Sequence, residues 1–126
     1  MRAPTLALCL LLMAGAAQAA DEPVTTPVGT FAATNSGQPI LLPQGPAQVT
    51  VSKVEIPEGF SLPVHRHPHP RYAYVLEGRI RVTNLDAATA VEYGPGDVII
   101  EARGQWHTGT ALGTGPVRLL VIDQTP

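Results

Sequence analysis

Three of the four histidines in this 126-residue chain fall within five positions, at His65, His67 and His69. Residues i and i+2 of a β-strand project from the same face, so His65 and His67 would point the same way. The fourth, His107, follows about 40 residues later, which is far enough for the chain to return on an opposing strand. We therefore predict that His65, His67 and His107 hold one divalent transition metal: iron, zinc, manganese, nickel or copper. The alternative is a set of surface-loop histidines, which the flanking Pro68 and Pro70 also fit.

The segments that must position these histidines have the pattern of β-strands. Short runs rich in β-branched residues alternate with glycine, proline and aspartate turns, and no window shows a long helical period. The predicted strands span residues 48–56, 61–65, 71–77, 79–84, 89–93, 97–102, 106–111 and 117–123. Strands this short and this regularly spaced predict an all-β sandwich or barrel in a single domain.

The N-terminal part of the chain has a different composition. Residues 1–19 carry one basic residue, an apolar run and an Ala-Gln-Ala sequence, so we expect a cleaved secretory signal peptide and a periplasmic or secreted protein. The only cysteine, Cys9, lies in that segment, so disulfides would play no part in the mature chain. Residues 20–46 are expected to form an extended arm with short edge strands at 31–34 and 40–42, followed by a barrel domain at 47–126.

The charge of the chain gives no sign of a polyanionic partner. Removal of the signal peptide leaves 7 basic and 10 acidic residues, with no basic cluster. Neither nucleic acid nor an anionic membrane surface is an expected partner, whereas a small molecule is.

The glycine and histidine spacings resemble the two sequence motifs of the cupin family, and the resemblance covers about residues 47–123. The matching positions are Gly59, His65, His67, Arg71 and Gly78 in the first motif, and Gly96, Gly104 and His107 in the second. The resemblance implies a jelly-roll β-barrel (double-stranded β-helix) in which His65, His67 and His107 are the metal ligands. It also implies a homodimer formed through edge strands, as cupin-like barrels often make.

Arg71 departs from the family pattern, because cupins usually have a metal-binding glutamate at that position. A guanidinium offers only hydrogen-bond donors and cannot be a ligand. About 5 Å from a metal, at an effective dielectric of about 20, its repulsion is on the order of 3 kcal/mol per unit charge pair. Three arrangements remain open: Arg71 pairs with Glu101 or Glu77, it binds an anionic substrate, or the site holds no metal.

Three neutral histidines would leave a divalent metal its full charge and at least one open position. Such a site can polarise a carbonyl or bind a chelating anion beside dioxygen. The resemblance implies a dioxygenase-like enzyme acting on a small oxygen-bearing or carboxylated compound. Arg71, His69 and Glu101 would then contact the substrate, with His69 at the rim of the barrel. Other cupins only bind, so a non-enzymatic metal- or ligand-binding protein remains the alternative.

Overall fold

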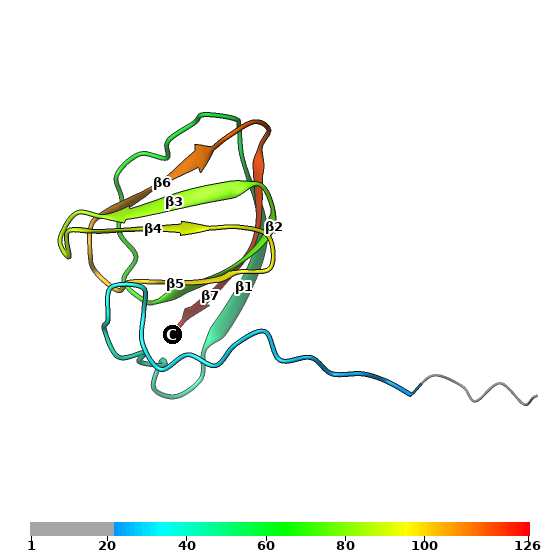
Figure 1. Cartoon of the computed structure of the whole chain (residues 1–126). Coiled ribbons are helices and arrows are strands. Elements are labelled where there is room, and N and C mark those ends of the chain that lie inside the picture. Colours follow the sequence, from blue (N-terminus) through cyan, green and yellow to red (C-terminus); the bar gives the residue numbers. More distant parts are fainter. Residues whose placement is uncertain (1–21) are drawn as a thin grey trace, which may run out of the picture.

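The computed structural model describes residues 22–126, and this part of the chain forms a seven-stranded β-barrel (Figure 1). The predicted signal peptide, and with it Cys9, lies outside the described residues. The strands are β1 (Gln48–Ile56), β2 (Arg71–Glu77), β3 (Arg79–Asn84), β4 (Thr89–Tyr93), β5 (Val98–Glu101), β6 (His107–Leu112) and β7 (Val117–Thr125).

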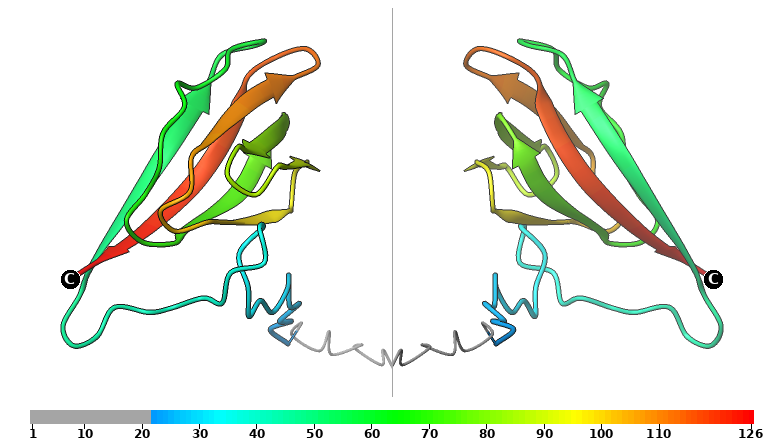
Figure 2. Two further views of the ribbon diagram at one scale, coloured as in Figure 1. Left: turned by 90° about the vertical axis from the view of Figure 1, so that its left-hand side faces the viewer. Right: turned by 90° about the vertical axis from the view of Figure 1, so that its right-hand side faces the viewer.

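The strands form two antiparallel sheets that face each other (Figure 2). One sheet has the order β1-β7-β2-β5 and the other has the order β4-β3-β6. This arrangement confirms the predicted all-β jelly roll. Residues 22–126 contain no helix, and hence none long and apolar enough to cross a membrane.

Alternation along the strands fills the barrel with aliphatic side chains. Ala73 and Val75 of β2 are buried, and so are their neighbours on the adjacent strands. The remaining buried members of this cluster are Ile56, Ile80, Val82, Ile99, Ala111, Val117, Leu119 and Val121. Because side chains alternate between the two faces of a strand, Arg71 lies on the same inward face as Ala73 and Val75. The inward side chains of β2 are therefore apolar at Val75 and Ala73 and become polar at Arg71, near the end of the barrel.

The turn between β2 and β3 requires glycine. Gly78 has a φ of 80°, and a Cβ built there would lie 2.4 Å from the backbone oxygen of Pro116. Both the positive φ and the close approach exclude a side chain at this position. This requirement explains the glycine that ends the first of the two motifs.

Two predicted strand segments are irregular in the structure. Residues 61–65 form only isolated bridges, Ser61 with Thr110 and His65 with His107, because Pro63 interrupts the segment. The arm forms a single bridge, between Ala33 and Pro39, in place of the two edge strands expected at 31–34 and 40–42. The arm lies against the barrel at β5, where the Asn35 amide donates to the Ile100 carbonyl over 2.7 Å (Figure 1).

Candidate metal centre

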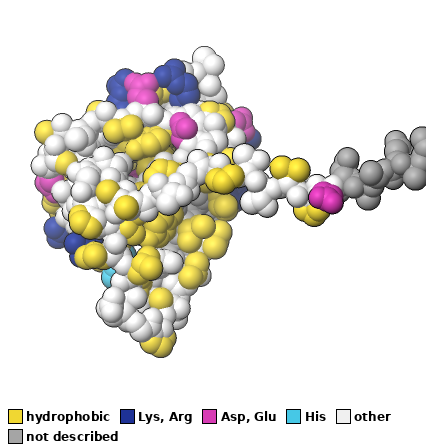
Figure 3. Space-filling model, turned by 60° about the horizontal axis from the view of Figure 1, so that its bottom comes forward, with side chains coloured by type: hydrophobic (Ala, Val, Ile, Leu, Met, Phe, Trp, Pro, Cys, Tyr) yellow, Lys and Arg dark blue, Asp and Glu magenta, His cyan; other side chains and the backbone are white. Residues whose placement is uncertain are grey.

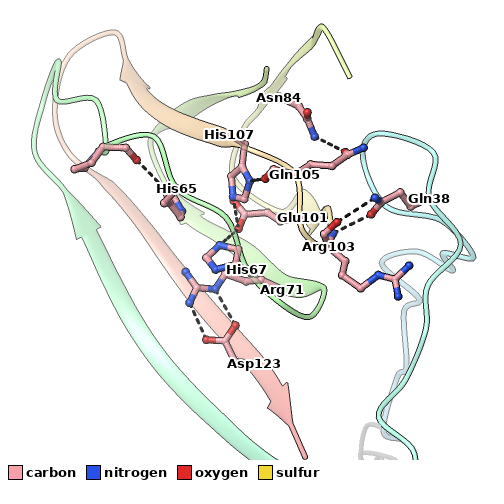
Figure 4. A network of polar contacts seen from close by, with 11 residues as sticks. Gln38, His65, His67, Arg71, Asn84, Glu101, Arg103, Gln105, His107 and Asp123 are labelled. Atoms are coloured by element: carbon pink, nitrogen blue, oxygen red, sulfur yellow. Dashed lines mark hydrogen bonds and ion pairs between the residues drawn. The ribbon is translucent and has the colours of Figure 1, made fainter. Parts of the chain in front are cut away.

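The structure brings His65, His67 and His107 together at one end of the barrel (Figure 4). One nitrogen of each ring lies within 4.8 Å of the corresponding nitrogen of the other two. The ring centroids are 4.6 Å apart for His65 and His107, 4.9 Å for His65 and His67, and 5.0 Å for His67 and His107. Histidines separated by about 40 residues in sequence therefore surround one point in space.

Backbone hydrogen bonds and bridges position the three histidines. His65 and His107 exchange two backbone hydrogen bonds of 2.9 Å, which anchor the proline-rich segment to the start of β6. His67 makes a parallel bridge with Arg103, and its carbonyl accepts from the Gly104 amide. Between the two histidines, Arg66 turns the other way, and its guanidinium lies 4.7 Å from the ring centre of Trp106. The predicted common direction of His65 and His67 thus arises from bridges rather than from a regular strand.

The ring nitrogens of His65 and His107 are oriented for metal binding. His65 Nδ1 donates to the Pro63 carbonyl over 2.7 Å, and His107 Nδ1 donates to the Gln105 carbonyl over 2.8 Å. Because a carbonyl oxygen only accepts, each Nδ1 carries a proton, and in the neutral ring each Nε2 keeps its lone pair. His107 Nε2 is buried and has no hydrogen-bond partner among residues 22–126. A bound cation would satisfy this nitrogen, so the three histidines fit a divalent transition metal.

Glu101, at the end of β5, reaches the same cluster. Its Oε2 accepts a hydrogen bond of 3.1 Å from His67 Nε2 and lies 3.5 Å from His107 Nε2. Burial acts to raise the pKa of Glu101, but His107 and His67 outweigh it and lower that pKa to about 2. Burial acts to lower the pKa of His107, but the Glu101 carboxylate raises it above its usual value. Burial, reinforced by His107 and His67, lowers the pKa of His65.

Arg71 points into the barrel and is neutralised there by Asp123. Its Nε donates to Asp123 Oδ1 over 2.8 Å, and its Nη2 donates to Asp123 Oδ2 over 2.9 Å. Of the three arrangements left open, the structure shows Arg71 paired with a carboxylate, but the candidate partners Glu101 and Glu77 are wrong. Glu101 contacts the histidines, and Glu77 pairs with Arg118. Asp123 lies directly across from Arg71 on β7, 52 residues away in sequence, and only strand pairing reveals this neighbour.

His69 lies beside the cluster rather than within it. Together with His67, Arg71 and Asp123 it lines a cavity of about 250 Å³. The structure therefore places two of the three predicted substrate-binding residues, Arg71 and His69, next to the histidines, while the third, Glu101, touches the histidines themselves.

A larger cavity, of about 670 Å³, lies elsewhere, between the arm and the outer face of β2 and β5. Its lining is aliphatic and aromatic, including Phe31, Tyr72 and Ile100, and it contains no histidine or carboxylate. The chemistry of the side chains, rather than the volume, therefore identifies the histidine end as the candidate site.

The arm supports the loop that leads into His107 at the start of β6, a contact that the sequence did not reveal. The Gln38 side chain exchanges two hydrogen bonds with the Arg103 backbone, of 2.9 Å and 3.1 Å (Figure 4). Ser36 Oγ and Asn84 Nδ2 both donate to Gln105 Oε1, over 2.7 Å and 2.8 Å. Since the Gln105 carbonyl holds His107 Nδ1, this network indirectly orients the His107 ring.

Two facing β-sheets that carry a histidine cluster at one end define a jelly-roll barrel with a candidate metal centre. The family model described as Cupin domain matches residues 52–123. The chain therefore belongs to the cupin family. A comparison with curated protein sequences found no match.

Similar solved structures agree with this assignment. The protein BH2720 from Bacillus halodurans is 26% identical with a TM-score of 0.56, over 62% of this chain and 63% of that one. The Cnp3 cupin domain of Schizosaccharomyces pombe is 29% identical with a TM-score of 0.57, over 68% and 61%. The polyketide cyclase RemF from Streptomyces resistomycificus is 27% identical with a TM-score of 0.55, over 70% and 66%. The matched region thus spans less than two thirds of the first two structures.

Proposed function

We propose that this protein is a periplasmic or secreted metal-binding cupin that uses His65, His67 and His107 to hold one divalent transition metal. The observation that carries the proposal is the convergence of the three rings together with the buried Nε2 of His107, which makes no hydrogen bond within residues 22–126. A bound metal would supply Lewis acidity or a position for dioxygen, and three histidine ligands leave coordination positions for a substrate.

The remaining residues of the site favour a small oxygen-bearing or carboxylated substrate. The cavity of about 250 Å³ beside His67 is bordered by Arg71 and His69, which offer a cationic group and a polar group to a ligand. Asp123 already occupies two donors of Arg71, so a substrate anion would have to compete with it. RemF, one of the similar structures, is named as a polyketide cyclase. This likeness supports the inclusion of diketones among the substrates to test.

Elemental analysis tests the metal site directly. Wild-type protein and a His65→Ala, His67→Ala variant are each loaded with iron, zinc, manganese, nickel or copper and then dialysed. We expect about one metal ion per wild-type chain and close to none in the variant. Equal metal content in the two proteins, for every metal offered, would contradict the proposal.

Oxygen uptake separates an enzyme from a binding protein. The iron-loaded wild type is assayed with diketones, thiols and catechols, and the double-histidine variant serves as the control. Uptake that needs the histidines supports a dioxygenase-like activity. A metal-loaded protein that takes up no oxygen with any of them favours the alternative, a non-enzymatic metal- or small-ligand-binding protein.

We also propose that the barrel forms a homodimer through the face that includes β1. Within residues 22–126, β1 pairs on one side only, with β7, and its outward Val49 and Val51 are exposed. Further apolar side chains gather on the barrel beside the arm, on the face seen in Figure 3. Sedimentation equilibrium of the wild type and of a Val49→Lys, Val51→Lys variant tests this, and a monomeric wild type would contradict it.

A further inference from the structure

We infer that Glu101 is the fourth protein ligand of the metal, so that a carboxylate on β5 replaces the one that cupins usually carry at position 71. This inference rests on the proposed three-histidine site and deepens it. It changes the predicted donor set from three nitrogens to three nitrogens and one oxygen.

The first support is the position of the carboxylate. Glu101 is the direct cross-strand partner of Arg71 in the β2–β5 pairing, so the two side chains occupy adjacent places on the inner face of the sheet. A carboxylate at 101 can therefore reach the region that a carboxylate at 71 would reach. Glu101 does so (Figure 4). Its side chain is only 15% exposed.

The second support is the spacing of the donor atoms. Two atoms that each bind a metal at about 2.1 Å lie about 3.0 Å apart at octahedral angles and about 3.4 Å apart at tetrahedral angles. Glu101 Oε2 lies 3.1 Å from His67 Nε2 and 3.5 Å from His107 Nε2. These distances are already those of neighbouring ligands in one coordination sphere. A metal bound to these two nitrogens would replace the proton that His67 Nε2 donates to Glu101, and it would have the Glu101 oxygen beside it.

The third support is the charge balance among the buried groups. Glu101 is an acid in the barrel interior, and such a group needs a positive partner. Its nearest inward cation, Arg71, directs two donors at Asp123 instead. The histidine cluster is therefore what Glu101 faces, and a divalent cation bound there would supply the missing positive charge. The Arg71–Asp123 pair, in turn, keeps the guanidinium charge compensated close to that cation.

Cobalt binding tests the role of Glu101, because Co²⁺ reports its ligands through visible absorption. Metal-free wild type and Glu101→Gln are titrated with Co²⁺. Glu77→Gln is the matched control, because it removes the same charge from an exposed pair with Arg118. We expect Glu101→Gln to weaken Co²⁺ binding at least tenfold and to shift the absorption bands, and Glu77→Gln to stay within twofold of wild type.

A second measurement distinguishes a ligand from a residue that only orients His67. Infrared difference spectra of the wild type, with and without metal, should show one shifted carboxylate stretch that disappears in Glu101→Gln. Weaker binding in the variant without such a shift in the wild type would overturn the inference. If Glu101→Gln fails to fold, the absence of any shifted carboxylate stretch in the wild type still overturns the inference.

The two proposals fail in different ways. If the wild type binds no more Co²⁺ than the His65→Ala, His67→Ala variant, the metal site itself is wrong. If the wild type binds Co²⁺ and Glu101→Gln matches it in affinity and spectrum, the three-histidine site stands and only the role of Glu101 is overturned.

Discussion

Two neighbouring rows of side chains cross the inner face of the same sheet and have opposite chemistry. In one row, Ala73 lies between Ile99 and Val121, and all three are at most 4% exposed. Two residues along the same strands, Arg71 lies between Glu101 and Asp123, all charged and 15–30% exposed. We call these the apolar row and the polar row.

The comparison shows how one barrel separates stability from function. Both rows lie on the same three paired strands and face the barrel interior. They differ only in position, because one row lies two residues further along each strand than the other. The apolar row removes hydrocarbon from water and contributes to the free energy of folding. The polar row costs desolvation. Hydrogen bonds offset part of that cost, because Arg71 pairs with Asp123 and Glu101 accepts from His67. Variants in the two rows should therefore affect different measurements.

The largest expected effect lies in the apolar row. Ile99→Ala should lower the free energy of unfolding by about 3 kcal/mol, because it removes a buried side chain and leaves a cavity. Urea unfolding measures the loss, and Co²⁺ titration of the folded variant should give wild-type affinity within about twofold. Glu77→Gln, on the exposed end of β2, is the control and should change stability by less than about 0.5 kcal/mol. A similarly small loss in Ile99→Ala would contradict the stabilising role of the apolar row.

The next effect depends on pH and lies in the polar row. The folded-state pKa of Glu101, about 2, is below its unfolded value of 4.5, so its stabilisation is present above about pH 4.5 and is lost as the pH falls toward 2. For the metal-free protein we expect this loss to be on the order of 2 kcal/mol. Urea unfolding of wild type and Glu101→Gln at pH 5, 4 and 3 measures it. The difference between the two proteins should shrink as the pH falls, and a constant difference would contradict the prediction.

The strands and the histidine cluster could be predicted from local sequence patterns. The side-chain partners that depend on the register between paired strands could not. Alternation and turn residues were sufficient for the seven strands, and the histidine spacing identified three rings that the structure brings together. The partner of Arg71 could not be found in this way, because Asp123 becomes its neighbour only through the β2–β7 pairing. The approach of Glu101 to His67 likewise needs the β2–β5 register and the irregular course of residues 61–70, where prolines prevent a regular strand.

Reversal of the charge at position 71 should change the free energy of metal binding. We expect this change to be smaller than the two losses of stability predicted above, for Ile99→Ala and for protonation of Glu101. Arg71→Glu, combined with Asp123→Asn to avoid a new repulsion, should raise metal affinity by about tenfold, or about 1.4 kcal/mol, because a carboxylate replaces a cation beside the histidines. Titration with zinc or manganese measures the gain. Arg81→Glu, an equal charge change on the exposed side of β3, is the control. Unchanged affinity would mean that position 71 lies electrostatically outside the site.

The smallest effect is expected from the Arg71–Asp123 pair itself. Both side chains are about 30% exposed, so water screens their attraction, although the two parallel hydrogen bonds favour it. A double-mutant cycle with Arg71→Gln and Asp123→Asn should give a coupling energy for unfolding below about 1 kcal/mol. Asp123→Asn alone should nevertheless weaken zinc binding severalfold, because the guanidinium loses its counter-charge close to the metal. The pair would then act on the site more than on the fold. A coupling energy above about 3 kcal/mol would instead mean that the polar row stabilises the barrel as strongly as the apolar row. The two rows would then not have separate roles in stability and in metal binding.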